Sequence, residues 1–201
     1  MSVMNIAKPA VFLDRDGVIN EQMGYINHIS RFVLLPGVGA AIARLNALGL
    51  MVVVATNQSG LARGYFPEEL LEAVHDRMRR ELAAAGARVD GIYVCPHHPE
   101  ARVARYRLAC DCRKPRPGLL LQAARELHLD LARSYMVGDR YADLRCGAAA
   151  GTKNILARSG YGRGEEQYLG PHEPLRPDHI ADDLTGAADW IAADFLKNNW
   201  P

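Results

Sequence analysis

The chain has 201 residues, of which 49% are hydrophobic and 23% are charged, a balance typical of a globular protein with a sizeable core. Its formal net charge of +1 offers no basic surface for nucleic acid, so nucleic-acid binding is disfavoured. No apolar run approaches the roughly 18 residues of a membrane span, and residues 1–8 do not resemble a secretion signal. We therefore expect a cytoplasmic protein with no membrane partner, folded as a single domain over residues 1–201 and, without an evident apolar seam, monomeric.

Strand-like apolar runs alternate with helical patterns along the chain. This alternation predicts an α/β protein in which a mainly parallel sheet carries helices on both faces. In chain order we expect strand 10–13, helix 38–48, strand 51–55, helix 67–86, strand 92–95, an irregular segment 96–116, helix 118–129, strand 135–137, helix 142–150, strand 155–157, a polar loop 160–177 and helix 184–196.

Two aspartates one residue apart follow the first of these strands. Asp14 and Asp16 come directly after Leu13, and Gly17 then lets the chain turn sharply. Open α/β sheets bind ligands at the carboxyl ends of their strands, and two close carboxylates repel each other unless a cation stabilises them. The pair suggests a magnesium site with a carboxylate free to act as nucleophile or proton carrier. The alternative is a plain turn in which Asp caps the following loop.

Two later strands also end in polar side chains. Thr56 and Asn57 follow the second strand, while Asp139 follows the fourth, with Asp143 one helical turn later. Taken singly, these residues could cap a turn or begin a helix favourably. Their repeated placement at strand ends instead predicts that acids, a hydroxyl and an amide converge at one edge of the sheet, provided that the strands are neighbours.

These residues resemble, in order, the four motifs of the haloacid dehalogenase superfamily of phosphohydrolases. The motifs are D-x-D-G-x-x-N over residues 14–20, Thr56, the lysine of Arg113-Lys114-Pro115, and Gly138-Asp139 with Asp143. The resemblance spans the whole domain and implies a Rossmann-like, three-layer fold with a parallel sheet. The short connections leave little room for a cap domain.

The resemblance also implies a role for each motif residue. Asp14 would attack phosphorus and form an aspartyl phosphate, while Asp16 would protonate the leaving oxygen and later deprotonate water. Thr56 and Lys114 would hold the transferring phosphoryl group. Catalytic Mg²⁺ would be held by Asp14, the backbone carbonyl of Asp16 and Asp139. Asp143 would orient Lys114 or Arg140 rather than bind the metal.

Three of the four cysteines lie at the end of the third strand or in the irregular segment that follows it. Cys95, His97, Cys110 and Cys112 form a C-x-H-x12-C-x-C set, which suits structural Zn²⁺ with no open position. His98 is an alternative fourth ligand, but the matching family motif implies His97; the bland alternative is a loop of reduced cysteines. Zinc over residues 95–112 would fix the adjoining Arg113 and Lys114 in place. The remaining cysteine, Cys146, is expected to be a buried packing residue.

The loop and four further stretches resemble the heptose bisphosphate phosphatase branch of the superfamily, and the histidinol-phosphatase branch has the same loop. The stretches are residues 24–26, 56–64, 95–99 and 135–139. The resemblance implies hydrolysis of the C7 phosphate of D-glycero-D-manno-heptose 1,7-bisphosphate, a small phosphosugar, in ADP-heptose and lipopolysaccharide-core biosynthesis. The implied substrate-binding residues are Gln22, Met23, Gly24, Tyr25, Thr56, Asn57, Gln58, Ser59, Arg113, Lys114 and Arg140.

Two of these residues carry specific expectations. Arg113 suits the second phosphate of a bisphosphate, because a planar guanidinium matches its oxygens. Arg140 stands where the family often has Lys, which leaves its role open. The alternatives are a histidinol-phosphate phosphatase, a polynucleotide 3′-phosphatase and a non-catalytic, zinc-stabilised binding module. The sequence leaves both heptose anomers, α and β, open.

Overall fold

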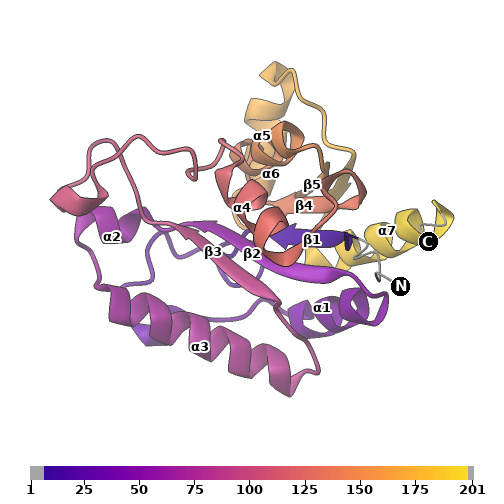
Figure 1. Ribbon diagram of the computed structural model, residues 1–201, viewed down its shortest axis with the longest axis horizontal. Helices are drawn as coiled ribbons and strands as arrows, with labels where there is room; N and C mark the ends of the chain where they lie inside the picture. The colour runs from indigo at the N-terminus through magenta and orange to yellow at the C-terminus, as the bar shows by residue number, and fades with distance from the viewer. Residues whose placement is uncertain (1–6, 199–201) are drawn as a thin grey trace, which may run out of the picture.

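A parallel sheet of six strands forms the centre of the computed structural model, which describes residues 7–198 (Figure 1). The strands lie in the order β3-β2-β1-β4-β5-β6, and every neighbouring pair is parallel. The α/β prediction is confirmed, although the sequence did not indicate β6. The strands are β1 (Ala10–Leu13), β2 (Met51–Asn57), β3 (Gly91–Cys95), β4 (Tyr135–Gly138), β5 (Lys153–Ala157) and β6 (His179–Ala181).

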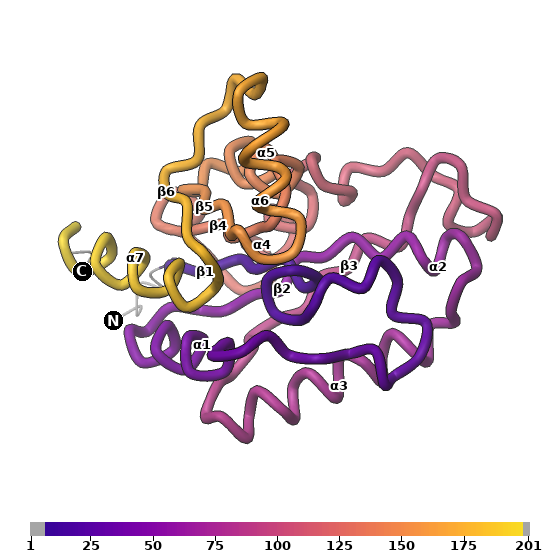
Figure 2. Tube along the Cα trace, turned by 180° about the vertical axis from the view of Figure 1, so that it is seen from behind, coloured from indigo at the N-terminus to yellow at the C-terminus, as the bar shows by residue number. Residues whose placement is uncertain are grey.

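Helices cover both faces of this sheet, which makes three layers (Figures 1 and 2). The apolar faces of α1 (Val38–Ala47), α3 (Glu68–Ala84) and α7 (Leu184–Lys197) share one hydrophobic cluster, and α4 (Gly118–Leu127) and α5 (Tyr141–Ala150) contribute to a second. Two short helices, α2 (Ser59–Arg63) and α6 (Gly162–Gly164), lie in connecting segments. No helix within residues 7–198 is long and apolar enough to cross a membrane.

The central strand β1 is buried on both faces. Val11 and Leu13 contribute to the cluster under α1, α3 and α7, whereas Ala10 and Phe12 contribute to the cluster under α4 and α5. All four side chains are fully buried, as expected for alternate residues of a strand covered by helices on both sides. This burial fixes the register of β1 and therefore the position of the residues that follow it.

The end of β1 lies where the direction of strand order reverses. Leu13 pairs with Val54 of β2 on one side and with Val137 of β4 on the other. The helices that follow β1 and β4, namely α1 and α5, cover opposite faces of the sheet. A crevice therefore opens between the two connections, in the position where α/β proteins of this kind bind ligands.

Three irregular segments follow strand ends and surround this crevice. Residues 14–37 follow β1 and residues 96–117 follow β3; each contains one 3-10 turn, η1 (Ile29–Arg31) and η2 (Ala104–Tyr106) respectively. Residues 158–178 follow β5 and contain α6, a π-helical turn η4 (Glu165–Leu169) and a 3-10 turn η5 (Gly170–His172). Within these described segments, the residues after β1 and β3 therefore add loops to the crevice rather than a further layer of helices and strands.

Candidate active site

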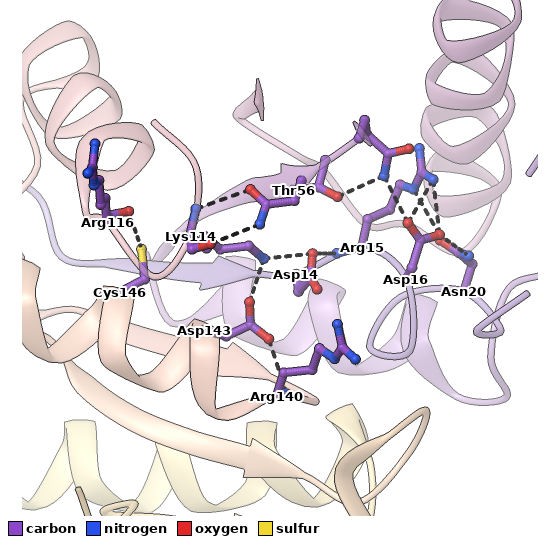
Figure 3. Close-up of polar contacts among 12 residues, drawn as sticks. Asp14, Arg15, Asp16, Asn20, Thr56, Lys114, Arg116, Arg140, Asp143 and Cys146 are labelled. Carbon is purple, nitrogen blue, oxygen red and sulfur yellow. Dashed lines mark hydrogen bonds and ion pairs between the residues drawn. The ribbon is translucent and has the colours of Figure 1, made fainter. Parts of the chain in front are cut away.

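The predicted strand-end residues converge around one buried lysine. Asp14 follows β1, Thr56 is near the end of β2, and Lys114 enters from the loop after β3 (Figure 3). The Lys114 Nζ atom lies 2.9 Å from Asp14 Oδ1 and 2.6 Å from Asp143 Oδ1. Burial alone would lower the pKa of Lys114, but the charges of Asp14 and Asp143 raise it above its usual value. The lysine is therefore a fixed positive charge at the base of the site.

The backbone of Lys114 is held by Asn57 at the end of β2. The Asn57 Nδ2 atom donates to the Lys114 carbonyl at 3.2 Å, and the Lys114 amide donates to Asn57 Oδ1, also at 3.2 Å. These two hydrogen bonds use both ends of the side-chain amide. Asn57 lines the cavity as expected, but the structure gives it a second function, which is to attach the loop after β3 to the sheet.

Three carboxylates lie together at the bottom of the site. One oxygen from each of Asp14, Asp139 and Asp143 lies within 4.8 Å of the others. Burial raises the pKa of Asp14 to about 6, Lys114 opposing and Asp143 adding to the effect. Burial, followed by repulsion from Asp14 and Asp143, raises the pKa of Asp139 to about 8. Among the described residues, the three carboxylates therefore have only Lys114 to balance their negative charge.

The environment of Asp139 indicates where a cation fits. Its Oδ2 atom accepts a hydrogen bond from the Tyr161 amide at 2.9 Å, whereas Oδ1 is buried without a hydrogen-bond partner among the described residues. Buried carboxylate oxygens are rarely left in this way. Gly17, with φ of +88°, passes so close that any Cβ there would clash with the Asp139 carboxylate. Oxygen ligands and a deficit of positive charge fit Mg²⁺.

Asp143 is occupied by groups of the protein itself. Its Oδ1 contacts Lys114, and its Oδ2 accepts from the Arg140 backbone amide at 3.1 Å. The Asp143 side chain therefore contacts both residues that it was predicted to orient, Lys114 through its side chain and Arg140 through its backbone. The ion pair on one oxygen and the hydrogen bond on the other are the contacts that the predicted role, orientation of Lys114, requires.

Asp16 lies beside Asp14 and is surrounded by hydrogen-bond donors (Figure 3). Arg15 pairs with both carboxylate oxygens, Asn20 Nδ2 donates to Oδ1 at 2.9 Å, and Gln58 Nε2 donates to Oδ2 at 2.8 Å. Burial would raise the pKa of Asp16, but Arg15, Asn20 and Gln58 together hold it below its usual value. Gln58 also donates to Thr56 Oγ1 at 3.0 Å, so one amide connects the second and first motifs.

A cavity of about 300 Å³ opens above these groups. Among the predicted substrate-binding residues, Met23 alone does not line it: the side chain packs against the hydrophobic core, while the carbonyl accepts from Arg31. Ile26, Gly60, Ala142 and Tyr161 line the cavity without having been predicted. The predicted residues in the lining are Asp14, Asp16, Gln22, Gly24, Tyr25, Thr56, Asn57, Gln58, Ser59, Arg113, Lys114 and Arg140.

Arg140 is held at the cavity wall by the segment after β5. Its guanidinium carbon lies 4.4 Å from the centre of the Tyr161 ring, and its Nε atom lies 3.8 Å from Glu165 Oε1. Cation–π contact and the ion pair limit where the charge points. No pattern in the polar loop 160–177 indicated Tyr161; the residue reaches the cavity because its backbone amide bonds to Asp139.

The Cys/His group lies at the start and end of the loop after β3. The Cys95 and Cys110 sulfurs are 3.5 Å apart, those of Cys110 and Cys112 are 3.1 Å apart, and His97 Nδ1 lies 3.4 Å from Cys112 Sγ. Zn–S bonds of about 2.3 Å in a tetrahedral site separate ligand atoms by roughly 3.5 to 3.8 Å. The four side chains thus form a group that fits a tetrahedral metal ion.

The alternative ligand His98 and the packing residue Cys146 both lie outside this group. His98 contacts Arg63 through Nε2 and accepts from the Glu100 amide through Nδ1. Cys146 is buried, and its thiol donates to the Arg116 carbonyl at 3.3 Å. The loop also positions a cavity residue directly, because Arg113 Nη1 donates to the His97 carbonyl at 3.3 Å.

The sheet order and the Asp14, Thr56, Lys114 and Asp139 constellation define a phosphohydrolase of the haloacid-dehalogenase-like class, and residues 111–187 match the HAD-hydrolase-like family model. The chain is 44% identical over 185 residues to D-glycero-β-D-manno-heptose-1,7-bisphosphate 7-phosphatase of Escherichia coli K12, covering 91% of this chain and 87% of that protein. The Yersinia pestis enzyme of the same name is 48% identical over 159 residues, or 78% of this chain and 84% of that one.

A solved structure gives the same result. D,D-heptose 1,7-bisphosphate phosphatase from B. bronchiseptica, complexed with magnesium and phosphate, matches with a TM-score of 0.82 and 38% identity, covering 92% of this chain and 99% of that chain. The chain belongs to the D,D-heptose 1,7-bisphosphate phosphatase family of haloacid-dehalogenase-like hydrolases, which are phosphoric monoester hydrolases.

Proposed function

We propose that this enzyme hydrolyses the C7 phosphate of D-glycero-β-D-manno-heptose 1,7-bisphosphate and releases heptose 1-phosphate, in ADP-heptose and lipopolysaccharide-core biosynthesis. The observation that carries the proposal is the 44% identity to an enzyme of that name over 91% of the chain. The cavity supports it, since its size suits a phosphosugar and its lining includes Arg113 and Arg140 in addition to Lys114. The cytoplasmic location and monomeric state expected from the sequence stay predictions.

The proposed reaction has two displacement steps. Asp14 attacks phosphorus in line and the bond to the sugar oxygen breaks. Asp16, whose proton affinity rises when the anionic substrate binds beside it, takes up a proton in the complex and gives it to that oxygen. Asp16, then a carboxylate, takes a proton from water, which attacks the aspartyl phosphate and releases inorganic phosphate. Lys114 and Thr56 hold the phosphoryl oxygens throughout. Mg²⁺, held by Asp14, Asp139 and the Asp16 carbonyl, would neutralise charge between the carboxylates and the phosphate.

The direct test is a comparison of substrates. The purified enzyme, with Mg²⁺, is assayed for phosphate release from both anomers of heptose 1,7-bisphosphate and from histidinol phosphate. We expect kcat/KM for the β-anomer to exceed that for histidinol phosphate by about 100-fold or more. A preference for histidinol phosphate would overturn the proposal and favour the branch that has the same metal-binding loop.

An Arg113→Ala variant extends this test to the second phosphate. Because the guanidinium lines the cavity and suits the phosphate that is not cleaved, the variant should lose about 10- to 100-fold in kcat/KM for the bisphosphate. Its kcat/KM for a simple monophosphate ester should change little. An equal loss on both substrates would instead place Arg113 at the reacting phosphate.

We also propose that the Cys95, His97, Cys110 and Cys112 group binds structural Zn²⁺. Burial raises the pKa of the Cys95 thiol, so this sulfur becomes a ligand thiolate through the charge of a bound ion. Four protein ligands leave no open position for water or substrate. The ion would act on catalysis indirectly, by fixing the loop that carries Arg113 and Lys114.

A Cys110→Ser variant tests this role. We expect its zinc content to fall from about one ion per chain to about a tenth of that, with a lower melting temperature and about a 10- to 100-fold loss in kcat/KM. Metal analysis, thermal unfolding and phosphate release provide the three measurements. Cys146→Ser is the matched control, since this buried thiol lies outside the group and should keep its zinc. Full zinc content in the Cys110 variant would show that the ion is bound elsewhere.

A further inference from the structure

A buried arginine connects Asp16 to helix α3. Arg15 is 1% exposed, and its Nε and Nη2 atoms donate to the two oxygens of Asp16 at 2.9 to 3.3 Å. On its other side, Arg15 Nη1 lies 3.2 Å from Nε2 of His75, a residue of α3 that is itself 7% exposed. A continuous chain of side chains therefore runs from the middle of α3 to the carboxylate beside the nucleophile.

The contact with Arg15 fixes the form of the imidazole ring. A guanidinium has only N–H donors, so His75 Nε2 accepts the hydrogen bond and the ring proton resides on Nδ1. Burial, together with the positive charges of Arg15 and Arg79, lowers the pKa of His75 to about 3. His75 is therefore a neutral hydrogen-bond acceptor, and the direction of its Nε2 lone pair determines where the Arg15 guanidinium is held.

We infer that His75 is a positioning residue for proton transfer: by accepting from Arg15, it holds the guanidinium in the orientation that fixes the Asp16 carboxylate in place at the cavity wall. The inference rests on the proposed function only in taking Asp16 as the acid and base. It assigns to α3 a part in catalysis, although His75 does not line the cavity.

The physical reason is that a buried guanidinium needs partners for its N–H groups. Without the acceptor on α3, Arg15 Nη1 is left unsatisfied in the interior, at a cost that favours rotation toward other acceptors. Rotation would break the paired contact with Asp16 and leave its carboxylate held only by Asn20 and Gln58. A shift of the acid by a fraction of an ångström weakens proton transfer more than it weakens substrate binding.

The leaving group separates this role from a merely structural one. An alkyl alcohol departs only with a proton from Asp16, whereas p-nitrophenolate departs without one. Moreover, kcat/KM depends only on the steps up to and including departure of the leaving group. For p-nitrophenyl phosphate it is therefore independent of the later step in which Asp16 takes a proton from water. A variant with a misplaced Asp16 should therefore be impaired on alkyl phosphates and normal on p-nitrophenyl phosphate.

The experiment compares His75→Leu with His75→Gln and Val74→Ala. Leu keeps bulk without an acceptor, Gln supplies an acceptor oxygen in place of Nε2, and Val74→Ala removes apolar volume from the same buried face of α3. For each variant, kcat/KM is measured for the alkyl phosphate that the wild-type enzyme hydrolyses fastest, heptose 1,7-bisphosphate included, and for p-nitrophenyl phosphate.

We expect His75→Leu to lose about tenfold or more on the alkyl phosphate and less than about twofold on p-nitrophenyl phosphate. His75→Gln should recover most of the loss, and Val74→Ala should leave the ratio of the two substrates unchanged. Equal losses on both substrates, or an unimpaired His75→Leu variant, would overturn the inference. Failure of the wild-type enzyme on heptose bisphosphate would overturn the proposed substrate alone, since the ratio is measured on any alkyl phosphate.

Discussion

An Asp14→Asn variant is expected to lose catalysis and, in the absence of Mg²⁺, to gain stability. The amide is no nucleophile, so no aspartyl phosphate forms and kcat should fall by about 10⁴-fold or more. Phosphate release and trapping of the phosphoenzyme measure the first effect. The second follows because the variant has one fewer carboxylate in a buried group that contains a single lysine.

The gain in stability has a defined pH range. Burial raises the pKa of Asp14 from 3.8 to about 6, so the folded state binds its proton more tightly than the unfolded state does. A raised carboxyl pKa makes the metal-free wild-type protein lose stability as pH rises from about 4 to about 6, after which the loss is constant. The Asn side chain does not ionise, so the melting temperature of the variant should fall less over this range.

Asp183→Asn is the control for Asp14→Asn. Asp183 caps α7 by accepting from the Gly186 amide at 3.0 Å and does not line the cavity. Asp183→Asn keeps a capping oxygen and should keep both activity and melting temperature. Full activity of Asp14→Asn in a preparation free of other phosphatases would disprove the mechanism, and a lower metal-free melting temperature would disprove the electrostatic argument.

A Lys114→Met variant should lose both activity and stability. Without Lys114, the carboxylates of Asp14, Asp139 and Asp143 have no positive side chain in direct contact among the described residues, and breaking a buried ion pair from one side costs about 3 kcal/mol. Because Lys114 is proposed to hold the phosphoryl group, loss of its charge should lower kcat/KM by about 10³-fold. Mg²⁺ and acid should each restore part of the melting temperature, because both reduce repulsion among the carboxylates.

Arg140→Met provides the comparison for stability. It removes a positive charge from the same cavity, but the side chain is 51% exposed and pairs weakly with Glu165. We expect its melting temperature to stay within a few degrees of the wild-type value. If Lys114→Met were as stable as Arg140→Met without Mg²⁺, the buried ion pairs of Lys114 would contribute nothing to stability, and the electrostatic argument would fail.

Much of the fold was predictable because the strands have a simple environment. The central strand β1 occupies the residues expected from its apolar run, since both of its faces are covered and every residue is buried. The edge strand β6 was missed because His179–Ala181 is short and flanked by Asp178 and Asp182. Its strand conformation comes from pairing with β5, for example Ile155 with His179, and pairing of this kind leaves no local pattern.

The site residues at the ends of strands could be predicted from the sequence. Those whose position depends on packing between distant segments could not. Asp14 and Asp139 follow β1 and β4, and Thr56 lies near the end of β2, so their convergence needed only the parallel topology. His75 has the same helical spacing as the apolar residues Leu71 and Met78, and nothing local separates it from a core position. Met23 was assigned to the cavity from its neighbours, but its apolar side chain is more favourably buried against the core. The roles of the individual site residues stay predictions, and the variants above test those of Asp14, Lys114 and Arg113.

The central position of β1 also affects the order in which the parts of the chain fold during synthesis. In a chain growing from its N-terminus, β1 can pair with β2 early, but its other edge has no partner until Tyr135–Gly138 has been synthesised. The Cys/His group needs nothing beyond Cys112, and its ligands are close in sequence, so a metal ion can close that loop first. If the group binds Zn²⁺ as proposed, metal supply during synthesis should change the yield of folded enzyme, apart from any effect on its rate.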